Sequence, residues 1–531
     1  MTTSTLLLAA LLAAAAPSRA DVDGPPEPTP TPGRVVPAPT VRPALSEQSA
    51  AEFEAQLRAS PLGKGIAPVP GGLTGDMVAD RSVEVAPSVE LRQLQIERAA
   101  VRLDQTIVSF LPQLNLRGGY TRLSKAAINF GGTASVIPTA TSDTVAPYEL
   151  PVTPCADPAA GQCAQGLLIT PPFKIEIPLN SYALTAQLSV PISDYILSLT
   201  PARKGPIAAR ESAELARDAE RIKVKTDARL AYYNWLRAVA ALIVLEDALV
   251  RTEARRTDVQ NLFDAGAATR SDVLRVDALV SAQQAAINDA RALRNVLERS
   301  LSVMMKEPPR TFEVGEDLLA PPRDIGRLPQ LDEMIEEALQ SRLEVRSLQR
   351  AIDGIEQGIK ATRAGYYPRL DAVADATYAN PNQRFFPLSA VWRGSWSAGV
   401  QISYSINSTL RTKATVREYK ADKREMIVQS EQMRRGITME VAQAYGDRIR
   451  AIQAIELNTR GLASAAEAYR VASENYAAGA ATTNEIIDAE GDQIQAGLRA
   501  ISAHIDLRVA NTRLLYATGR LNPEAAKPAR K

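Results

Sequence analysis

The chain has 531 residues, with 61 Lys and Arg residues against 60 Asp and Glu residues and a net charge of +1. This balance lacks the basic surface that nucleic-acid-binding proteins need, so no nucleic-acid partner is expected. With one His, two Cys and no P-loop, GxSxG, HExxH or CxxC motif, the sequence favours neither an enzyme nor a metal or cofactor site.

Two segments at the N-terminus are expected to lie outside the folded part. Residues 1–20 contain an apolar stretch from Leu6 to Ala16 and end in Ser18-Arg19-Ala20, which is typical of a signal peptide with its cleavage site. Residues 21–72 hold eleven prolines and few apolar side chains. We therefore expect a disordered arm, because so little apolar surface cannot offset the entropy lost on ordering the chain.

Residues 73–310 are predicted to form a first structural repeat. Helical spacing begins at Leu73, breaks at Pro87 and ends at Pro112, because proline lacks the amide that a helix interior needs. Residues 114–120 and 182–192 then alternate apolar with polar side chains, as strands do when one face is apolar and the other is in water. The loop between these strands holds Cys155 and Cys163, for which we expect a disulfide in an exported protein.

A connector, residues 311–327, is followed by a second predicted repeat, residues 328–521, and a short basic tail, residues 522–531. The second repeat has the same landmarks in the same order. Phe110-Leu-Pro-Gln-Leu114 returns as Tyr366-Tyr-Pro-Arg-Leu370, and the alternating strands return as residues 370–380 and 396–406. We infer a duplication.

Each repeat continues into a long helix, predicted from Pro206 to Phe263 and from Arg411 to Tyr476. Helices of this length span about 90 Å, too much for a compact domain. Each ends in a tip turn with a glycine, Gly266 or Gly479, which we expect in the left-handed conformation. The returning helices carry apolar side chains at coiled-coil spacing, among them Val276, Val280, Ile287, Ile494, Leu498, Ile501 and Ile505.

The strands are about ten residues long, enough to cross a bilayer when tilted. In a membrane they would have to form a closed barrel, which needs about eight strands, so several copies of the chain must contribute. The alternative is an ordinary half-buried sheet packed on helices.

With its duplicated halves, its Leu-Pro-x-Leu and Tyr-Pro-x-Leu strand entries and its Tyr-x-x-Gly tip before an acidic helix, the chain resembles the TolC-like outer-membrane efflux protein (outer-membrane factor) family from Leu73 to Leu521. The resemblance implies a mainly α fold with membrane β-strands. Duplicated helical hairpins would form a periplasmic α-barrel, and four strands from each chain of a homotrimer would form a 12-stranded β-barrel in outer-membrane lipid.

The resemblance also implies a function. Such proteins are outer-membrane channels with a large periplasmic portion, and they serve as exit ducts of tripartite efflux or type I secretion systems. Their partners are a periplasmic adaptor (membrane fusion protein) and an inner-membrane pump, and their cargo is drugs, metals or polypeptides.

Residue roles follow from the same resemblance. Glu485 and Asp488, at the start of the second returning helix, match acids that line the closed pore, although acids at a helix N-terminus also stabilise the helix dipole. Tyr476 and Asp272 match a latch between the two tips. Some family members have a basic residue where this chain has Ala481.

Two other classes of protein compete with the channel. A soluble periplasmic coiled-coil scaffold or adaptor would have the helices without a barrel. An outer-membrane enzyme is disfavoured, because no acid, base and nucleophile set can be assembled from the sequence.

Overall fold

The fold is described by a computed structural model of the chain, in which two units, residues 1–50 and 51–531, are distinguished. Every described residue lies in the second unit. The described residues are 58, 61–125, 127–130, 134–137, 166–169, 173–176, 178–318, 320, 328–386 and 388–521. The expected signal peptide, the disulfide expected between Cys155 and Cys163, and the tail 522–531 lie outside the described residues. Within them, no helix combines the length and the apolar character needed to cross a membrane.

Three helices open the described chain: α2 (Pro61–Gly65), α3 (Gly75–Val85) and α4 (Pro87–Val108). The Thr74 hydroxyl caps α3 by accepting a hydrogen bond from the Met77 amide at 3.2 Å. Pro87 is the first residue of α4, a position whose amide makes no hydrogen bond within the helix, so proline costs nothing there. The break predicted at this proline is confirmed.

The end of the predicted arm is folded, so the prediction of disorder is wrong for residues 61–72. Ile66 is only 2% exposed, and the Val69 amide donates a hydrogen bond to the Val314 carbonyl at 2.8 Å. Leu73 forms a parallel bridge with Val314. The prediction rested on the many prolines and missed these few apolar side chains, which join a core that also includes Val314 and Leu318 of the connector.

Four strands form one antiparallel sheet in the order β1 (Gln113–Arg122), β6 (Asn180–Val190), β7 (Arg369–Asn380) and β8 (Arg393–Ser403). All four strands were predicted, and the pairing of β6 with β7 joins the two repeats. The predicted strands ran on to Ile192 and Ile406, which instead begin helices α5 (Ile192–Leu197) and α10 (Ile406–Ala477). Pro191 cannot extend a strand ladder because it has no amide, and Ser405 occupies the helix N-cap.

Two short strand pairs lie within the segment between β1 and β6, which was predicted to be a loop. β2 (Ala127–Phe130) pairs with β5 (Phe173–Glu176), and β3 (Ala134–Ile137) pairs with β4 (Gly166–Ile169).

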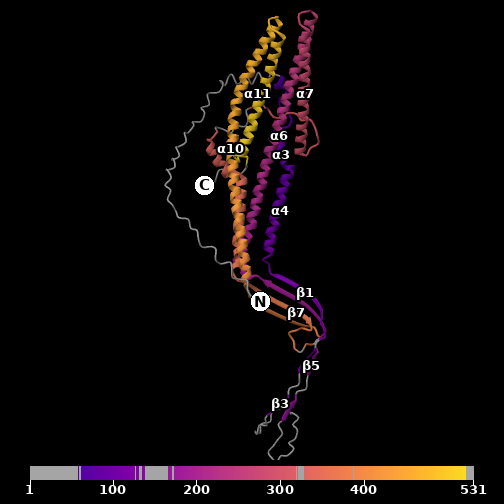
Figure 1. The fold of residues 1–531 in the computed structure, drawn as a ribbon, viewed down its shortest axis with the longest axis vertical. Coiled ribbons are helices and arrows are strands. Elements are labelled where there is room, and N and C mark those ends of the chain that lie inside the picture. Colours follow the sequence, from indigo (N-terminus) through magenta and orange to yellow (C-terminus); the bar gives the residue numbers. More distant parts are fainter. Residues whose placement is uncertain are drawn as a thin grey trace, which may run out of the picture. The chain divides into compact units, whose positions relative to one another are not determined.

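The long helices are α6 (Leu199–Asp264), of 66 residues, and α10, of 72 residues (Figure 1). Their returning partners are α7 (Arg270–Met305) and α11 (Thr483–Ala517). The helix α6 begins before the predicted Pro206 and continues through it, because packing against neighbouring helices outweighs the local preference of one residue. The second repeat supplies α8 (Leu331–Ser341), α9 (Leu343–Arg363) and a short 3-10 turn, Ala364–Tyr366.

The helices next to the sheet follow the order of the strands. α4 leads into β1, α6 follows β6 and α5, α9 leads into β7 through the 3-10 turn, and α10 follows β8. Contacts join α4 to α6, α6 to α9 and α9 to α10. The helical layer therefore has the order α4-α6-α9-α10, which repeats the order β1-β6-β7-β8.

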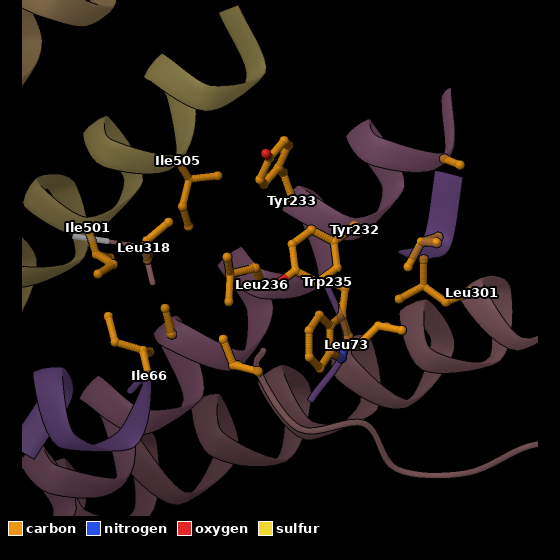
Figure 2. Packing of buried hydrophobic residues seen from close by; sticks show 14 of the residues in the cluster. Ile66, Leu73, Tyr232, Tyr233, Trp235, Leu236, Leu301, Leu318, Ile501 and Ile505 are labelled. Carbon is orange, nitrogen blue, oxygen red and sulfur yellow. The ribbon is translucent and has the colours of Figure 1, made fainter. Parts of the chain in front are cut away.

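An apolar core holds the two repeats together (Figure 2). Trp235 and Leu236 of α6 are fully buried against Leu301 of α7 and against Ile501 and Ile505 of α11. Since these helices come from different halves of the chain, the core fixes one repeat on the other. The predicted seam residues Ile501 and Ile505 are confirmed as buried.

A second, smaller core repeats this arrangement in the other half. Met334 and Ala338 of α8 pack on Val441 and Ala444 of α10, as Val78 and other α3 residues pack on α6. The duplication inferred from the sequence is therefore visible in the packing.

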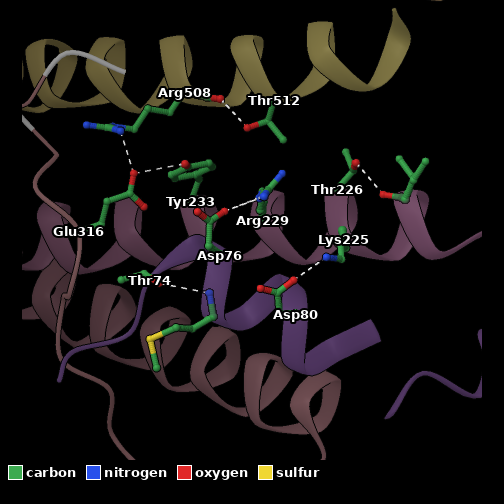
Figure 3. Close-up of polar contacts among 12 residues, drawn as sticks. Thr74, Asp76, Asp80, Lys225, Thr226, Arg229, Tyr233, Glu316, Arg508 and Thr512 are labelled. Carbon is green, nitrogen blue, oxygen red and sulfur yellow. Dashed lines mark hydrogen bonds and ion pairs between the residues drawn. The ribbon is translucent and has the colours of Figure 1, made fainter. Parts of the chain in front are cut away.

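Charged side chains fix the connector to the apolar core (Figure 3). Arg508 of α11, 8% exposed, donates to the Glu316 carboxylate at 2.8 Å and to the carbonyls of Asp317 and Ala320 at 2.6 and 2.8 Å. The Tyr233 hydroxyl also donates to Glu316, at 3.4 Å. Through these bonds Arg508 supplies donors to carbonyls of the connector, whose prolines prevent a continuous helix.

Replacement of Arg508 by Met tests this role. The substitution removes the donor of the Asp317, Leu318 and Ala320 carbonyls and leaves the half-buried Glu316 with Tyr233 as its remaining donor among these residues, so we expect a loss of about 3–5 kcal/mol in stability. Thermal denaturation followed by circular dichroism measures it. The control is Arg470→Met on α10, whose exposed ion pairs with Glu467 and Glu474 contribute little to stability because water screens them. Equal melting temperatures for the two variants would contradict the assignment.

Candidate functional site

The sheet has one apolar and one polar face, as the alternation predicted. The register places Leu116 of β1 beside Ala186 of β6, then Ala376 of β7 and Trp396 of β8. The adjacent row is Asn115, Gln187, Asp375 and Ser397. Leu116 and Trp396 are about three-quarters exposed, at 76% and 75%, so nothing in the described chain covers the apolar face over them. Such a face requires an apolar partner.

The sheet also has two free edges. Within the described residues, β1 pairs only with β6 and β8 pairs only with β7. One side of each edge strand therefore presents amide and carbonyl groups without a strand partner, and such an edge readily pairs with another chain.

Aromatic side chains gather at the end of the sheet that is distant from the long helices. The ring centroids of Tyr120 and Tyr182 are 5.0 Å apart, and Trp392 lies 6.0 Å from Tyr182 and 5.0 Å from Tyr378. Tyr404 follows β8 at the opposite end and is 56% exposed. Aromatic side chains therefore lie at both ends of the exposed apolar face.

The two hairpin tips have the same construction. Gly266 and Gly479 have φ values of +74° and +71°, the left-handed conformation predicted for them. In the first tip the Ala267 amide donates to the Leu262 carbonyl at 2.8 Å and the Gly266 amide donates to the Phe263 carbonyl at 2.9 Å. In the second, the Ala480 and Gly479 amides make the same two bonds. This pair of bonds is the Schellman motif, which ends a helix on a glycine.

Each returning helix opens with a capping box. Thr269 and Asp272 cap α7, and Thr482 and Glu485 cap α11, each side chain bonding the backbone of the other residue. Hydrogen bonds from the Thr269 side chain and backbone lower the pKa of Asp272.

The predicted latch between Tyr476 and Asp272 is not formed in the chain. The Asp272 carboxylate is occupied by the Thr269 hydroxyl and amide, at 2.6 and 3.0 Å. Among the described residues, the Tyr476 hydroxyl is buried and has no hydrogen-bond partner. Its ring instead lies under the Arg255 guanidinium, 5.1 Å from the ring centroid. The physical reason is local, because both of these bonds go to Oδ2 of Asp272 and hold the carboxylate at the start of its own helix.

Both predicted pore acids, Glu485 and Asp488, are exposed at the start of α11. Glu485 accepts a hydrogen bond from the Thr482 amide at 3.1 Å, so it also caps the helix. Asp488 is three residues later and therefore on the same side of α11.

The sequence reasoning missed the contacts that join the two hairpins near their tips. Glu490 of α11, 1% exposed, accepts a hydrogen bond from Thr252 of α6 at 3.2 Å, with Arg251 at 3.9 Å. Burial raises the pKa of Glu490, while the Thr252 hydrogen bond and the nearby arginines lower it. A signal was present, since residue 490 falls four positions before Ile494 in the apolar seam, where a carboxylate is out of place.

The chain is similar in sequence and in fold to known outer-membrane proteins. A family model described as "Outer membrane efflux protein" matches residues 334–520. The outer membrane efflux protein BepC of Brucella suis biovar 1 (strain 1330) is 23% identical over 360 residues, which are 65% of this chain and 75% of that protein. Among solved structures, CusC has a TM-score of 0.65 and 16% identity over 84% of this chain and 92% of its own. The outer-membrane channel OprN has a TM-score of 0.63 and 17% identity, over 91% and 97%.

Two glycine substitutions test the tip turns. Gly479→Ala should destabilise the second tip by about 1 kcal/mol, because a Cβ disfavours positive φ even where space is open. Gly461→Ala, inside α10 and equally free of neighbours, should instead stabilise by about 0.5–1 kcal/mol. Melting temperatures of the purified protein measure both effects. Shifts of the same sign would contradict the conformational role of Gly479.

Proposed function

We propose that this chain belongs to the TolC-like outer-membrane efflux protein family and that three copies of it join edge to edge into one continuous duct. The duct crosses the outer membrane and acts as the exit of a tripartite efflux system. The single observation that carries this proposal is the sheet, which combines an uncovered apolar face with two unpaired edges.

The direction of the strands allows closure. Four strands that alternate in direction leave β8 running opposite to β1, so β1 of a second copy continues the antiparallel pattern. An eight-stranded barrel from two copies is just wide enough for its own side chains to fill. Twelve strands from three copies leave a lumen, lined by the polar rows that include Gln187 and Asp375.

The helices support the same closure, because their order copies that of the strands. α4 and α10 stand at the two edges of the layer next to the sheet, and α7 and α10 stand at the edges nearer the tips. Large apolar side chains are exposed on these edge helices, whereas α9 and α11 have none. The exposed set includes Leu91, Leu94, Val101 and Val108 on α4, Leu274, Leu293, Val296 and Val303 on α7, and Val428, Met439 and Leu457 on α10.

At the tips, Glu485 and Asp488 would form two rings of three carboxylates in the trimer. Rings of like charge raise the local concentration of cations and favour their passage. The capping role of Glu485 is compatible with this proposed pore role, because the cap holds the carboxylate at the N-terminus of α11, next to the tip turn. A periplasmic adaptor would contact the tip turns at Gly266 and Gly479 and connect the duct to an inner-membrane pump.

Charge placed on an edge helix tests the assembly. Leu94→Glu with Val101→Glu puts two carboxylates on the exposed face of α4, which should weaken each contact between copies by about 1–3 kcal/mol. The heat-modifiable, detergent-requiring oligomer should be lost. The control is Val250→Glu on α6, 68% exposed but not on an edge helix, which should leave the oligomer intact. A soluble monomer of the unmodified chain would remove the proposal.

Neutral substitutions test the pore acids. Glu485→Gln with Asp488→Asn keeps a side chain that can cap α11 and removes six negative charges from the trimer. The cation-to-anion permeability ratio in planar bilayers should fall several-fold. The matched control is Glu333→Gln with Glu336→Gln, an exposed acid pair at the same spacing on α8. Equal ratios in all three proteins would exclude the two acids from the pore.

A further inference from the structure

The side of α4 that faces away from α6 repeats every seven residues. Ile96 is the residue of α4 that is buried, where the helix packs on α6. On the opposite side of α4, three exposed apolar side chains form a row: Leu94, Val101 and Val108. An acidic row lies beside them, about a quarter turn past Ile96 in the direction of the chain, and it consists of the exposed Glu90, Glu97 and Asp104.

The helix α10 carries the opposite charge at the same spacing. Its side toward α9 is marked by Val416, which is buried, and by Lys423, which donates to Glu356 of α9 at 2.9 Å. About a quarter turn past this side, again in the direction of the chain, lies a row of exposed cations: Lys413, Lys420 and Arg424. Beyond the cations lies a row of exposed apolar side chains: Leu410, Ala414, Ala421 and Val428.

These charged rows have no partners within one copy. Among the described residues, no ion pair or side-chain hydrogen bond forms at the three acids of α4 or at the three cations of α10. Charged rows that flank an apolar seam are typical of coiled coils, in which they select the partner helix and its orientation.

The two rows lie at the same distances from the sheet. Asp104 is nine residues before the start of β1, and Lys413 is ten residues after the end of β8. One heptad farther from the sheet, Glu97 and Lys420 are matched in the same way. The two helices run in opposite directions, because α4 leads into β1 and α10 follows β8. Rows that each lie a quarter turn past the neighbouring helix of their own copy therefore come to the same side of a contact between copies.

The seam and its other flank also match. At distances from the sheet that agree within one residue, Leu94 of α4 corresponds to Ala421 of α10, so a large side chain would meet a small one. On the other flank the charges are exchanged. Arg98 of α4 is fifteen residues before β1, and Glu418 of α10 is fifteen residues after β8, and both are exposed.

We propose that α4 and α10 of neighbouring copies form an antiparallel coiled coil, in which Asp104 and Glu97 of one copy pair with Lys413 and Lys420 of the next. The partner that fits this surface is a second copy of the chain, because both flanks and the seam are complementary. Two α10 helices in contact would instead oppose cations to cations, and two α4 helices would oppose acids to acids. The charges thus favour a head-to-tail contact, which can close into a ring. The inference rests on the proposed function and names the residues that select the partner helix.

Charge reversal and its rescue test the pairing in the full-length protein. Lys413→Glu with Lys420→Glu opposes acids to acids in each of the three contacts, so the trimer fraction should fall at least several-fold. Size-exclusion chromatography with light scattering in mild detergent measures it. Glu97→Lys with Asp104→Lys should have the same effect. The chain with all four substitutions again opposes unlike charges and should assemble as the unmodified chain does. A folding defect would instead be greatest in this fourfold variant.

The matched control is Arg203→Glu with Lys204→Glu. Both residues are exposed near the start of α6, which lies between α4 and α9 of its own copy. This variant makes the same change in net charge and should leave the trimer fraction unchanged. If the fourfold variant stays dissociated, if either reversal leaves the trimer intact, or if the control dissociates it equally, the pairing is refuted while the duct stands. If the unmodified protein forms no trimer, the proposed function itself fails.

Discussion

The unpaired edges of a four-stranded sheet are the constraint on which the rest of this structure depends. In water, the edge groups of β1 and β8 could bond to solvent, but in hydrocarbon each would lack a partner at a cost of several kcal/mol. The exposed apolar face of the same sheet would be more stable in contact with hydrocarbon than with water. The proposed trimer meets both requirements together, because the edges of each sheet then pair with those of other copies. The helical layer has the same order as the strands, so closing the sheet also brings the edge helices of neighbouring copies together.

Duplication solves a second problem, the support of helices that are each about 100 Å long. A single pair of such helices would have little to pack against over most of its length. Here α6 packs on α3, α7, α9 and α11 at different heights, and α10 packs on α8, α9 and α11. The apolar core at Trp235 and the buried Arg508 fix the two halves to each other and to the connector. Beyond this support, polar contacts such as that of Glu490 with Thr252 join the two hairpins near the tips.

The tips show how local structure and function can share a residue. Glu485 is a helix cap by its hydrogen bonds, and the pore role proposed for it is compatible with that cap because its carboxylate is exposed. Asp272 differs, because its carboxylate bonds to Thr269 through Oδ2, whereas the hydroxyl of its expected latch partner Tyr476 has no hydrogen-bond partner among the described residues. The hairpins are joined instead through Glu490 and arginines of α6 and α7.

Much of this protein was determined by sequence periodicity alone. Alternation of two residues located the four strands and their two faces, seam spacing located buried residues such as Ile501 and Ile505, and the repeated tip motif identified Gly266 and Gly479. These features depend on neighbours within a few residues, so the sequence contains them directly. Three features were decided only by the tertiary structure: the folding of residues 61–72 onto Val314, the continuation of α6 through Pro206, and the partners of Tyr476 and Glu490. Each depends on residues that are distant in the sequence. Only the packed fold determines which of several possible partners a side chain contacts.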